Sequence, residues 1–387
     1  MVVALAVVGI GILVWQGRTP EPGDFYTPPA SVPAAPGTVI RSEPFTRGVP
    51  EGARAWRILY SSTDPEGTPI AVSALVVTGT GSRSSPRPVL AWAHGTTGVV
   101  SGCAPSLTDQ AITRIPDIER LLARGWVVVA TDYPGLGTPG PHPYLVGESE
   151  ARSVIDSVRA ARALDTGLSL QDRYAVWGES QGGHAGLFTG EIAREYAPEL
   201  DLVGVAAFAP ATDLGALLAA SQGTRTGALL TSETLYAWSR YYPGLSFDDA
   251  VAEGARDRAR RVARRCITSP SILIALVQSA LLPKDFVAID IVTDRRWSPR
   301  IAQNTPSQPI AAPLFVAQGL KDIVVSPAVT RAHVRERCAR GEAVEFRECP
   351  ASGHVDVIDA AGRAALAWTE ERLAGRPAPI ACPAGVG

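Results

Sequence analysis

Lysine is nearly absent from this chain of 387 residues. It occurs only as Lys284 and Lys321, although Lys and Arg together number 36, so arginine carries almost all the positive charge. The formal net charge is −2, which gives no electrostatic reason to expect nucleic acid or an anionic membrane as partner. Charged residues make up 19% and hydrophobic residues 46% of the chain. This composition excludes global disorder and provides a sizeable core.

Cysteine is also sparse, and its spacing excludes the common cysteine motifs. The 5 cysteines contain no C-x-x-C pair, the spacing typical of zinc sites and thioredoxin-like redox centres. No other cluster of side chains predicts a metal site, and no motif calls for an organic cofactor. In an exported protein these cysteines predict two disulfides and one odd thiol, whereas in a cytosolic protein they would be scattered thiols.

An uninterrupted apolar run, VVALAVVGIGILVW, occupies residues 2–15. It is shorter than the roughly 20 residues that span a bilayer, which favours a signal peptide over a spanning helix. No Lys or Arg precedes the run and no small-x-small cleavage site follows it, so an uncleaved anchor and a buried strand are alternatives. We predict that residues 1–18 are a signal peptide or membrane anchor, and that the protein is secreted or associated with the cell envelope.

Residues 19–55 are rich in Pro and Gly and predict an extended N-terminal arm. After the arm, apolar runs alternate with helical patterns. The predicted strands are 56–63, 70–79, 88–94, 126–132, 173–178, 202–210, 313–319 and 344–349. The predicted helices are 115–124, 148–164, 182–196, 327–340 and 357–373. The later strands are continuous apolar runs, typical of strands covered on both faces. We therefore predict an α/β fold for residues 56–387, with a mainly parallel sheet and helices on both faces.

One interval breaks this alternation. About ninety residues, from about 212 to 306, separate two predicted strands, which is far more than an ordinary crossover needs. The interval contains helical material of its own, including SILIALVQSALL at 271–282. It predicts an inserted subdomain over one edge of the sheet.

The segment Gly178-Glu179-Ser180-Gln181-Gly182 lies between a predicted strand and a predicted helix. The G-x-S-x-G pattern alone is weak, but the strand before it and the helix after it make it much more specific. Gly178 and Gly182 allow the flanking backbones to pass close together. The serine hydroxyl then lies at a helix N-terminus, where developing negative charge is stabilised. We predict that Ser180 is a nucleophile rather than a serine in a glycine-rich turn.

A serine nucleophile needs a base, and His354 is the best candidate. It follows the last predicted strand, and the carboxyl ends of parallel strands meet at the edge that carries Ser180. His184 lies in the helix after Ser180 and points along it. His333 belongs to a predicted surface helix and His142 to a Pro-rich loop.

The base needs a carboxylate to hold its tautomer, and we assign Asp322 in FVAQGLKDIVVSP. Asp322 lies in the loop after the preceding strand, at the same edge. Asp356 is too near His354 in sequence to reach its ring easily, and Asp294 lies in the inserted interval. The order Ser180, Asp322, His354 is the chain order of α/β-hydrolases.

An oxyanion hole is expected beside the nucleophile. Its first donor is the backbone N–H of Gln181, and the second comes from the loop His94-Gly95-Thr96-Thr97-Gly98 after an earlier strand. Thr96 is the predicted donor, with Thr97 as alternative.

With these residues assigned, the chain resembles the secretory lipase family of α/β-hydrolases, the lipase-A type, from residue 24 onward. The matching segments are DFYTPP, CAPS, TDYPGLG, GESQGGHA, REYAPELDLVG, VAQGLKDIVV and ASGHVDV. The resemblance implies the same triad, a cap over an acyl-binding pocket at 212–306, and a disulfide between Cys103 and Cys266. The loop HGTTG differs from the family's usual sequence, and the pairing among Cys338, Cys349 and Cys382 stays open.

The leading hypothesis is a secreted serine hydrolase that cleaves carboxylic esters of lipids or other acyl groups through an acyl-enzyme. Its partners would be small-molecule or lipid esters and, transiently, a lipid interface. An acyltransferase with the same triad and a non-catalytic binding module with a hydrolase fold are the alternatives.

Overall fold

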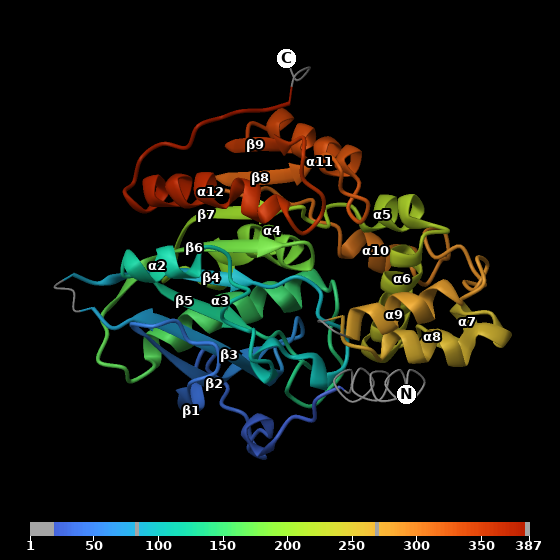
Figure 1. Cartoon of the computed structure of the whole chain (residues 1–387), viewed down its shortest axis with the longest axis horizontal. Coiled ribbons are helices and arrows are strands. Elements are labelled where there is room, and N and C mark those ends of the chain that lie inside the picture. Colours follow the sequence, from blue (N-terminus) through green and yellow to red (C-terminus); the bar gives the residue numbers. More distant parts are fainter. Residues whose placement is uncertain (1–18, 82–84, 268–270, 384–387) are drawn as a thin grey trace, which may run out of the picture.

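The computed structural model describes residues 19–81, 85–267 and 271–383. These residues form a nine-stranded sheet in the order β1-β2-β3-β5-β4-β6-β7-β8-β9 (Figure 1). β4 to β9 run parallel, whereas β1, β2 and β3 join the sheet antiparallel. The strands are β1 (Val39–Phe45), β2 (Ala53–Thr63), β3 (Pro69–Gly79), β4 (Arg87–Ala93), β5 (Val127–Thr131), β6 (Leu170–Glu179), β7 (Asp201–Phe208), β8 (Leu314–Gly319) and β9 (Val344–Cys349). The sheet is mainly parallel, as predicted.

The eight predicted strands correspond to β2 to β9, but the sequence does not predict β1. β1 lies within the segment predicted as an arm, where it pairs only with β2 at the edge of the sheet. Its sequence VIRSEPF carries two charges and a proline, and most of its residues are partly exposed. Edge strands tolerate charge and proline, so they lack the apolar run that identifies a central strand.

Helices cover both faces of the sheet. One apolar cluster joins the sheet to α3, α4 and α11, and a second joins it to α2 and α12. The helices are α2 (Ile118–Ala123), α3 (Gly147–Ala163), α4 (Gln181–Tyr196), α11 (Pro327–Ala339) and α12 (Val357–Leu373). Burial on both faces explains why the central strands are continuous apolar runs.

Between β7 and β8 the chain leaves the sheet and forms a set of helices beside it (Figure 1). We call this segment, residues 209–313, the insertion. Its helices are α5 (Leu214–Ser221), α6 (Arg225–Tyr241), α7 (Phe247–Ala250), α8 (Arg256–Ala263), α9 (Ser271–Ala280) and α10 (Ser298–Gln303). An apolar cluster packs the insertion together and includes Val99 and residues 144–146 from the sheet domain. In this cluster Trp238 and Trp297 stack with ring centroids 6.2 Å apart.

Short 3₁₀ helices complete the secondary structure. They are η1 (Asp24–Tyr26), η2 (Ser101–Cys103), η3 (Pro105–Leu107) and η4 (Glu253–Ala255). The segment 1–18, predicted as a signal peptide or anchor, lies outside the described residues. Within those residues, none of the helices combines the length and the apolar character needed to cross a membrane.

Two disulfides connect distant parts of the chain. Cys103, after β4, is bonded to Cys266, after α8, so this bridge fastens the insertion to the sheet domain. The pairing that the sequence leaves open is Cys338 with Cys382, which ties the end of α11 to the C-terminal segment. Cys349 is the free thiol.

The bridge between Cys103 and Cys266 should contribute strongly to stability. It spans 163 residues of sequence, and closing a long loop removes much of the conformational entropy of the unfolded chain. The double variant Cys103→Ser, Cys266→Ser should lose about 2–5 kcal/mol in the free energy of unfolding, measured by guanidinium denaturation. The control Cys349→Ser should change it by no more than about 1 kcal/mol. An equal loss in both variants would contradict this role.

Candidate functional site

Ser180 occupies a strained turn between β6 and α4. Its backbone has φ 55° and ψ −115°, outside the regions that non-glycine residues normally adopt. The turn is held by the Ser180 N–H, which donates to the Phe208 carbonyl at 2.9 Å. α4 starts at the next residue, Gln181. The hydroxyl therefore stands at the carboxyl end of β6 and at the N-terminus of a 16-residue helix.

The two flanking glycines are required by close backbone contacts. A Cβ on Gly178 would lie 2.0 Å from the Gly182 carbonyl oxygen, and one on Gly182 would lie 1.8 Å from the Ala93 carbonyl oxygen. No larger residue fits at either position without moving the backbone. The turn is thus packed directly against the end of β4.

His354 and Asp322 are hydrogen-bonded to each other. His354 Nδ1 lies 2.8 Å from Asp322 Oδ2. Because a carboxylate accepts, Nδ1 donates, and Nε2 is the nitrogen that can accept a proton. The structure thus brings together two of the predicted residues from loops after β8 and β9. These loops pack closely: a Cβ on Gly319 would lie 2.3 Å from the Gly353 carbonyl oxygen.

The loop after β8 holds the Asp322 carboxylate with several donors. Oδ1 accepts from the Val324 and Val325 N–H groups at 2.8 Å each, and Oδ2 accepts from Gln318 Nε2 at 2.9 Å. Burial opposes the charge, but the bond from His354 and these N–H groups outweigh it, so the pKa of Asp322 lies below its ordinary value of 3.8. The carboxylate is therefore stably ionised and its orientation is fixed.

The two alternative acids contact other groups. Asp356 Oδ1 accepts from the Gly353 N–H at 2.7 Å, within the histidine's own loop. Asp294 accepts from the N–H groups of Arg296 and Trp297 in the insertion. Neither carboxylate is hydrogen-bonded to His354.

Ser180 and the His354–Asp322 pair lie in the same region. A narrow cavity of ≈ 70 Å³ is lined both by Ser180 and by Val324 and Val325, whose N–H groups bind Asp322. Burial raises the pKa of Glu179, which precedes Ser180, and the charges of His354 and Asp322 act on the same carboxyl. The predicted serine and the hydrogen-bonded acid and base therefore lie in neighbouring loops at the carboxyl edge of the sheet.

The predicted oxyanion donors flank this point. Gln181 is the first residue of α4, where helix N–H groups have no intrahelical acceptor. Thr96 lies three residues after β4, and β4 is paired with β6 up to Ala93 and Gly178. The Thr96 hydroxyl is hydrogen-bonded to the Tyr144 hydroxyl at 3.0 Å. Both donors thus belong to segments beside Ser180.

The walls of the cavity come largely from residues that the sequence analysis did not single out. They are apolar, with a few hydroxyl groups: Tyr144, Leu145, Ala211, Leu214, Leu217, Leu218, Ser221, Leu230, Thr231, Thr234 and Trp238. Most belong to α5 and α6 of the insertion. Helical periodicity in this segment could have indicated an apolar face, but not what that face covers.

The remaining histidines are buried away from His354. His333, predicted on a surface helix, is buried on α11 and accepts from Arg337 Nε at 3.2 Å, so the prediction of a surface position was wrong. His184 Nδ1 lies 3.1 Å from Oε2 of Glu150, a fully buried residue of α3. The sequence analysis did not single out Glu150, which lies in the helix predicted at 148–164.

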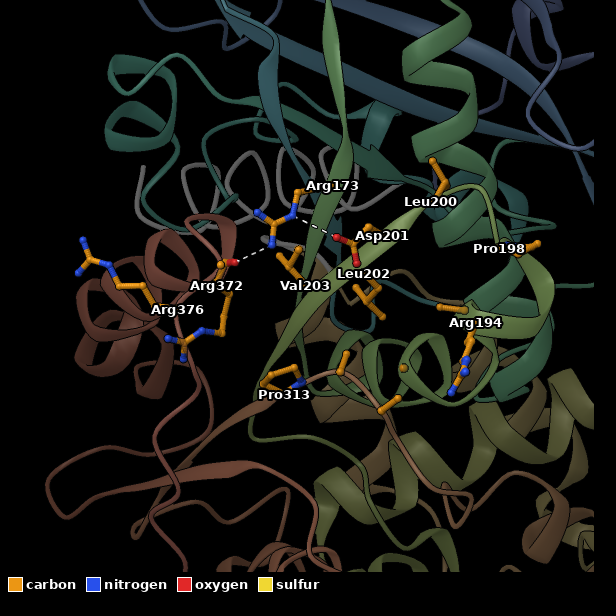
Figure 2. A pocket seen from close by; sticks show the side chains of 15 residues that line it. Arg173, Arg194, Pro198, Leu200, Asp201, Leu202, Val203, Pro313, Arg372 and Arg376 are labelled. Carbon is orange, nitrogen blue, oxygen red and sulfur yellow. Dashed lines mark hydrogen bonds and ion pairs between the residues drawn. The ribbon is translucent and has the colours of Figure 1, made fainter.

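A larger cavity of ≈ 650 Å³ lies at the opposite edge of the sheet, at the start of β7 (Figure 2). Four arginines line it, and Arg173 is paired with Asp201 at 3.1 Å. None of the predicted site residues lines this cavity. In the ranges that the structure covers, no group of three or more His, Cys, Asp or Glu side chains could hold a metal ion.

The family model for secretory lipases matches residues 107–380. A probable inactive lipase of Mycobacterium tuberculosis is 27% identical, with 94% of this chain and 87% of the relative covered. Lipase A of Arthroderma benhamiae is 24% identical, with 92% and 80% covered.

The fold is also similar to that of a solved enzyme structure. Candida antarctica lipase A in its closed state superposes with a TM-score of 0.77 at 21% identity, covering 95% of this chain and 91% of that one. This likeness confirms the predicted α/β-hydrolase fold. Together with the family match, it shows that this chain belongs to the secretory lipase family.

Proposed function

We propose that this protein hydrolyses carboxylic esters through an acyl-enzyme formed on Ser180. The hydrogen bond between His354 and Asp322, beside the strained Ser180 turn, carries this proposal. A serine hydroxyl is a poor nucleophile unless a base takes its proton. His354 is paired with Asp322 through Nδ1, whereas both ring nitrogens of His184 are bonded to other groups.

The residues support a two-step mechanism. His354 Nε2 accepts the Ser180 proton while Oγ attacks the ester carbonyl, and Asp322 stabilises the imidazolium. The Gln181 and Thr96 N–H groups donate to the tetrahedral oxyanion. The imidazolium then protonates the leaving alcohol, which departs and leaves an acyl-serine. Water attacks this ester with His354 again as base, which releases the carboxylic acid and restores the Ser180 hydroxyl.

The surroundings of Ser180 favour an apolar acyl group. The cavity beside it is walled mainly by apolar side chains, including Leu217 and Leu218 of α5. Three of its lining residues, Leu218, Ser221 and Thr231, also line a second cavity of ≈ 510 Å³ inside the insertion. We propose that the insertion acts as a cap and that acyl chains extend from Ser180 towards this second cavity.

The protein's environment is also a proposal. We infer that the chain is exported, because a family of secretory lipases and two disulfides are both consistent with an oxidising compartment. A lipid surface fits the outer face of α9, where Leu273, Val277 and Leu281 are 61–64% exposed at four-residue spacing.

Hydrolysis is to be distinguished from two alternatives. An acyltransferase would use the same residues with an alcohol in place of water. A binding module without catalysis has a precedent in the relative described as a probable inactive lipase. Labelling of Ser180 and analysis of the products distinguish both alternatives from hydrolysis.

A fluorophosphonate should add once to the intact wild-type protein and not to Ser180→Ala, because only Oγ is activated by His354. Mass spectrometry measures the adduct, and the same samples are assayed on p-nitrophenyl butyrate and palmitate. An adduct with transfer to an added alcohol in preference to water would indicate an acyltransferase. Absence of an adduct on folded wild type would favour the binding module.

Asp322→Asn should reduce kcat/KM by about 10⁴-fold, because the amide favours the wrong tautomer of His354. Asp294→Asn, a matched change in the insertion, should retain activity.

The pH dependence of stability has a defined sign. Folding lowers the pKa of Asp322 below its ordinary value of 3.8. The ionised carboxylate therefore contributes its full stabilisation of the folded state above pH 3.8, and this contribution is lost as the pH falls through the pKa of the folded state. The difference in unfolding free energy between wild type and Asp322→Asn should therefore shrink from pH 5 to pH 3, and a constant difference would contradict this.

Thr231→Trp should shorten the accepted acyl chain. Thr231 lines both cavities, so an indole there would fill the passage between them. The palmitate-to-butyrate ratio of kcat/KM should fall by about 10-fold or more. Arg240→Trp, at an exposed position near the end of the same helix, is the control for added bulk. Equal ratios in the two variants would exclude this route for the acyl chain.

A further inference from the structure

Glu150 is a fully buried carboxyl group directly behind the proposed active site. It lies on α3 at 0% exposure, where burying a charge is costly unless the charge is paired. Oε1 accepts from the Leu145 N–H at 2.9 Å and from Gln181 Nε2 at 2.7 Å. Oε2 lies 3.1 Å from His184 Nδ1. Three groups from two segments, the turn at 144–145 and the start of α4, thus converge on one side chain.

The first of these groups, the Gln181 side chain, belongs to one proposed oxyanion donor. The Gln181 side chain is buried, and its Nε2 contacts both Glu150 and His142 Nε2, the latter at 3.2 Å. His142 Nδ1 donates to the Pro134 carbonyl at 2.8 Å, and burial lowers the pKa of His142 to about 3. The neutral His142 Nε2 can therefore accept from Gln181. These bonds fix the side chain of Gln181. They therefore also restrict the orientation of its backbone N–H, the proposed oxyanion donor.

The second group, the Leu145 N–H, leads to the other proposed donor. Leu145 has a left-handed φ of 53°, an unfavourable conformation that its bond to Glu150 helps to hold. The hydroxyl of the neighbouring Tyr144 is hydrogen-bonded to the Thr96 hydroxyl. The Tyr144 carbonyl accepts from Trp238 Nε1 at 2.7 Å. The turn at 144–145 thus connects Glu150 to the loop that carries Thr96.

The third group, the His184 ring, orients Glu150 itself. His184 Nε2 donates to the Asn304 carbonyl at 2.8 Å, so one proton is held between His184 Nδ1 and Glu150 Oε2. Asn304 also accepts from the Gly147 N–H at 3.1 Å and donates to the Tyr242 hydroxyl at 2.7 Å. The Glu150 carboxylate thus contacts His184 of α4, and His184 links it to Asn304 at the end of the insertion.

We propose that Glu150 is a positioning residue for ester hydrolysis, which fixes the oxyanion donor Gln181 directly and the donor Thr96 through Leu145 and Tyr144. This inference rests on the proposed function. Hydrogen-bond donors stabilise a transition state only when they already point to the place where negative charge develops. Loss of the hydrogen bonds to Glu150 would therefore let the two donors move and weaken their binding of the tetrahedral intermediate. The apolar contacts of the substrate would remain.

Glu150→Gln tests this positioning role. The amide keeps the shape of the side chain but cannot carry a negative charge, so the bonds that its oxygen accepts from the Leu145 N–H and from Gln181 Nε2 become neutral and weaker. kcat should fall by about 10- to 100-fold with KM changed by less than about twofold. The inhibition constant of a trifluoromethyl ketone, which forms a tetrahedral adduct on Ser180, should rise by the same factor. A merely structural role would lower the thermal midpoint and leave kcat per folded molecule and the inhibition constant unchanged.

Glu148→Gln is the matched control. Glu148 lies two residues earlier in α3, with its side chain 41% exposed and paired to Arg152 at 2.6 Å. The same change there should leave kcat and the inhibition constant within about twofold of wild type.

A second variant keeps the inference falsifiable if Glu150→Gln does not fold. Gln181→Met removes the side-chain amide that is hydrogen-bonded to Glu150 but retains the backbone N–H group, which is the proposed donor. It should give the same joint change in kcat and inhibition constant, and combining it with Glu150→Gln should add little. Folded variants with unchanged kcat and inhibition constant would overturn the inference alone. A wild type without turnover or fluorophosphonate adduct would overturn the proposed function and this inference with it.

Discussion

The close packing of the β6–α4 turn on the end of β4 is the constraint on which the rest of the site depends. With Gly182 against the Ala93 carbonyl, the turn can hold Ser180 in a conformation that an unconstrained serine would leave. The same contact brings the loop after β4 beside the N-terminus of α4. One backbone arrangement therefore places the hydroxyl, the helix N-terminus and the second loop together.

Buried polar groups make this arrangement rigid. Behind the turn, the Glu150 carboxylate is paired with groups from α4 and from the 144–145 turn, so its burial is compensated. In front of it, Asp322 is held by two backbone N–H groups and by His354. The site thus has fixed groups on both sides of Ser180, which is the preorganisation that electrostatic stabilisation of an oxyanion requires.

The insertion is part of this site rather than an appendage to the sheet. Trp238 of α6 donates to the Tyr144 carbonyl, and Asn304 binds His184. The disulfide between Cys103 and Cys266 adds a covalent link. Fold and family alone do not establish catalysis, as a relative described as probably inactive illustrates. The case for catalysis therefore rests on the residues around Ser180.

The sequence by itself determined the central strands, the flanking helices and the predicted order of Ser180, Asp322 and His354. These features have local signals: apolar runs, helical periodicity, and glycines around a serine. It did not reveal β1, the bond between Cys338 and Cys382, or the burial of His333. Glu150 lies in a predicted helix, but its partners are residues 145, 181 and 184. Only the tertiary structure decided these contacts, because each joins segments whose proximity depends on how the sheet, helices and insertion pack.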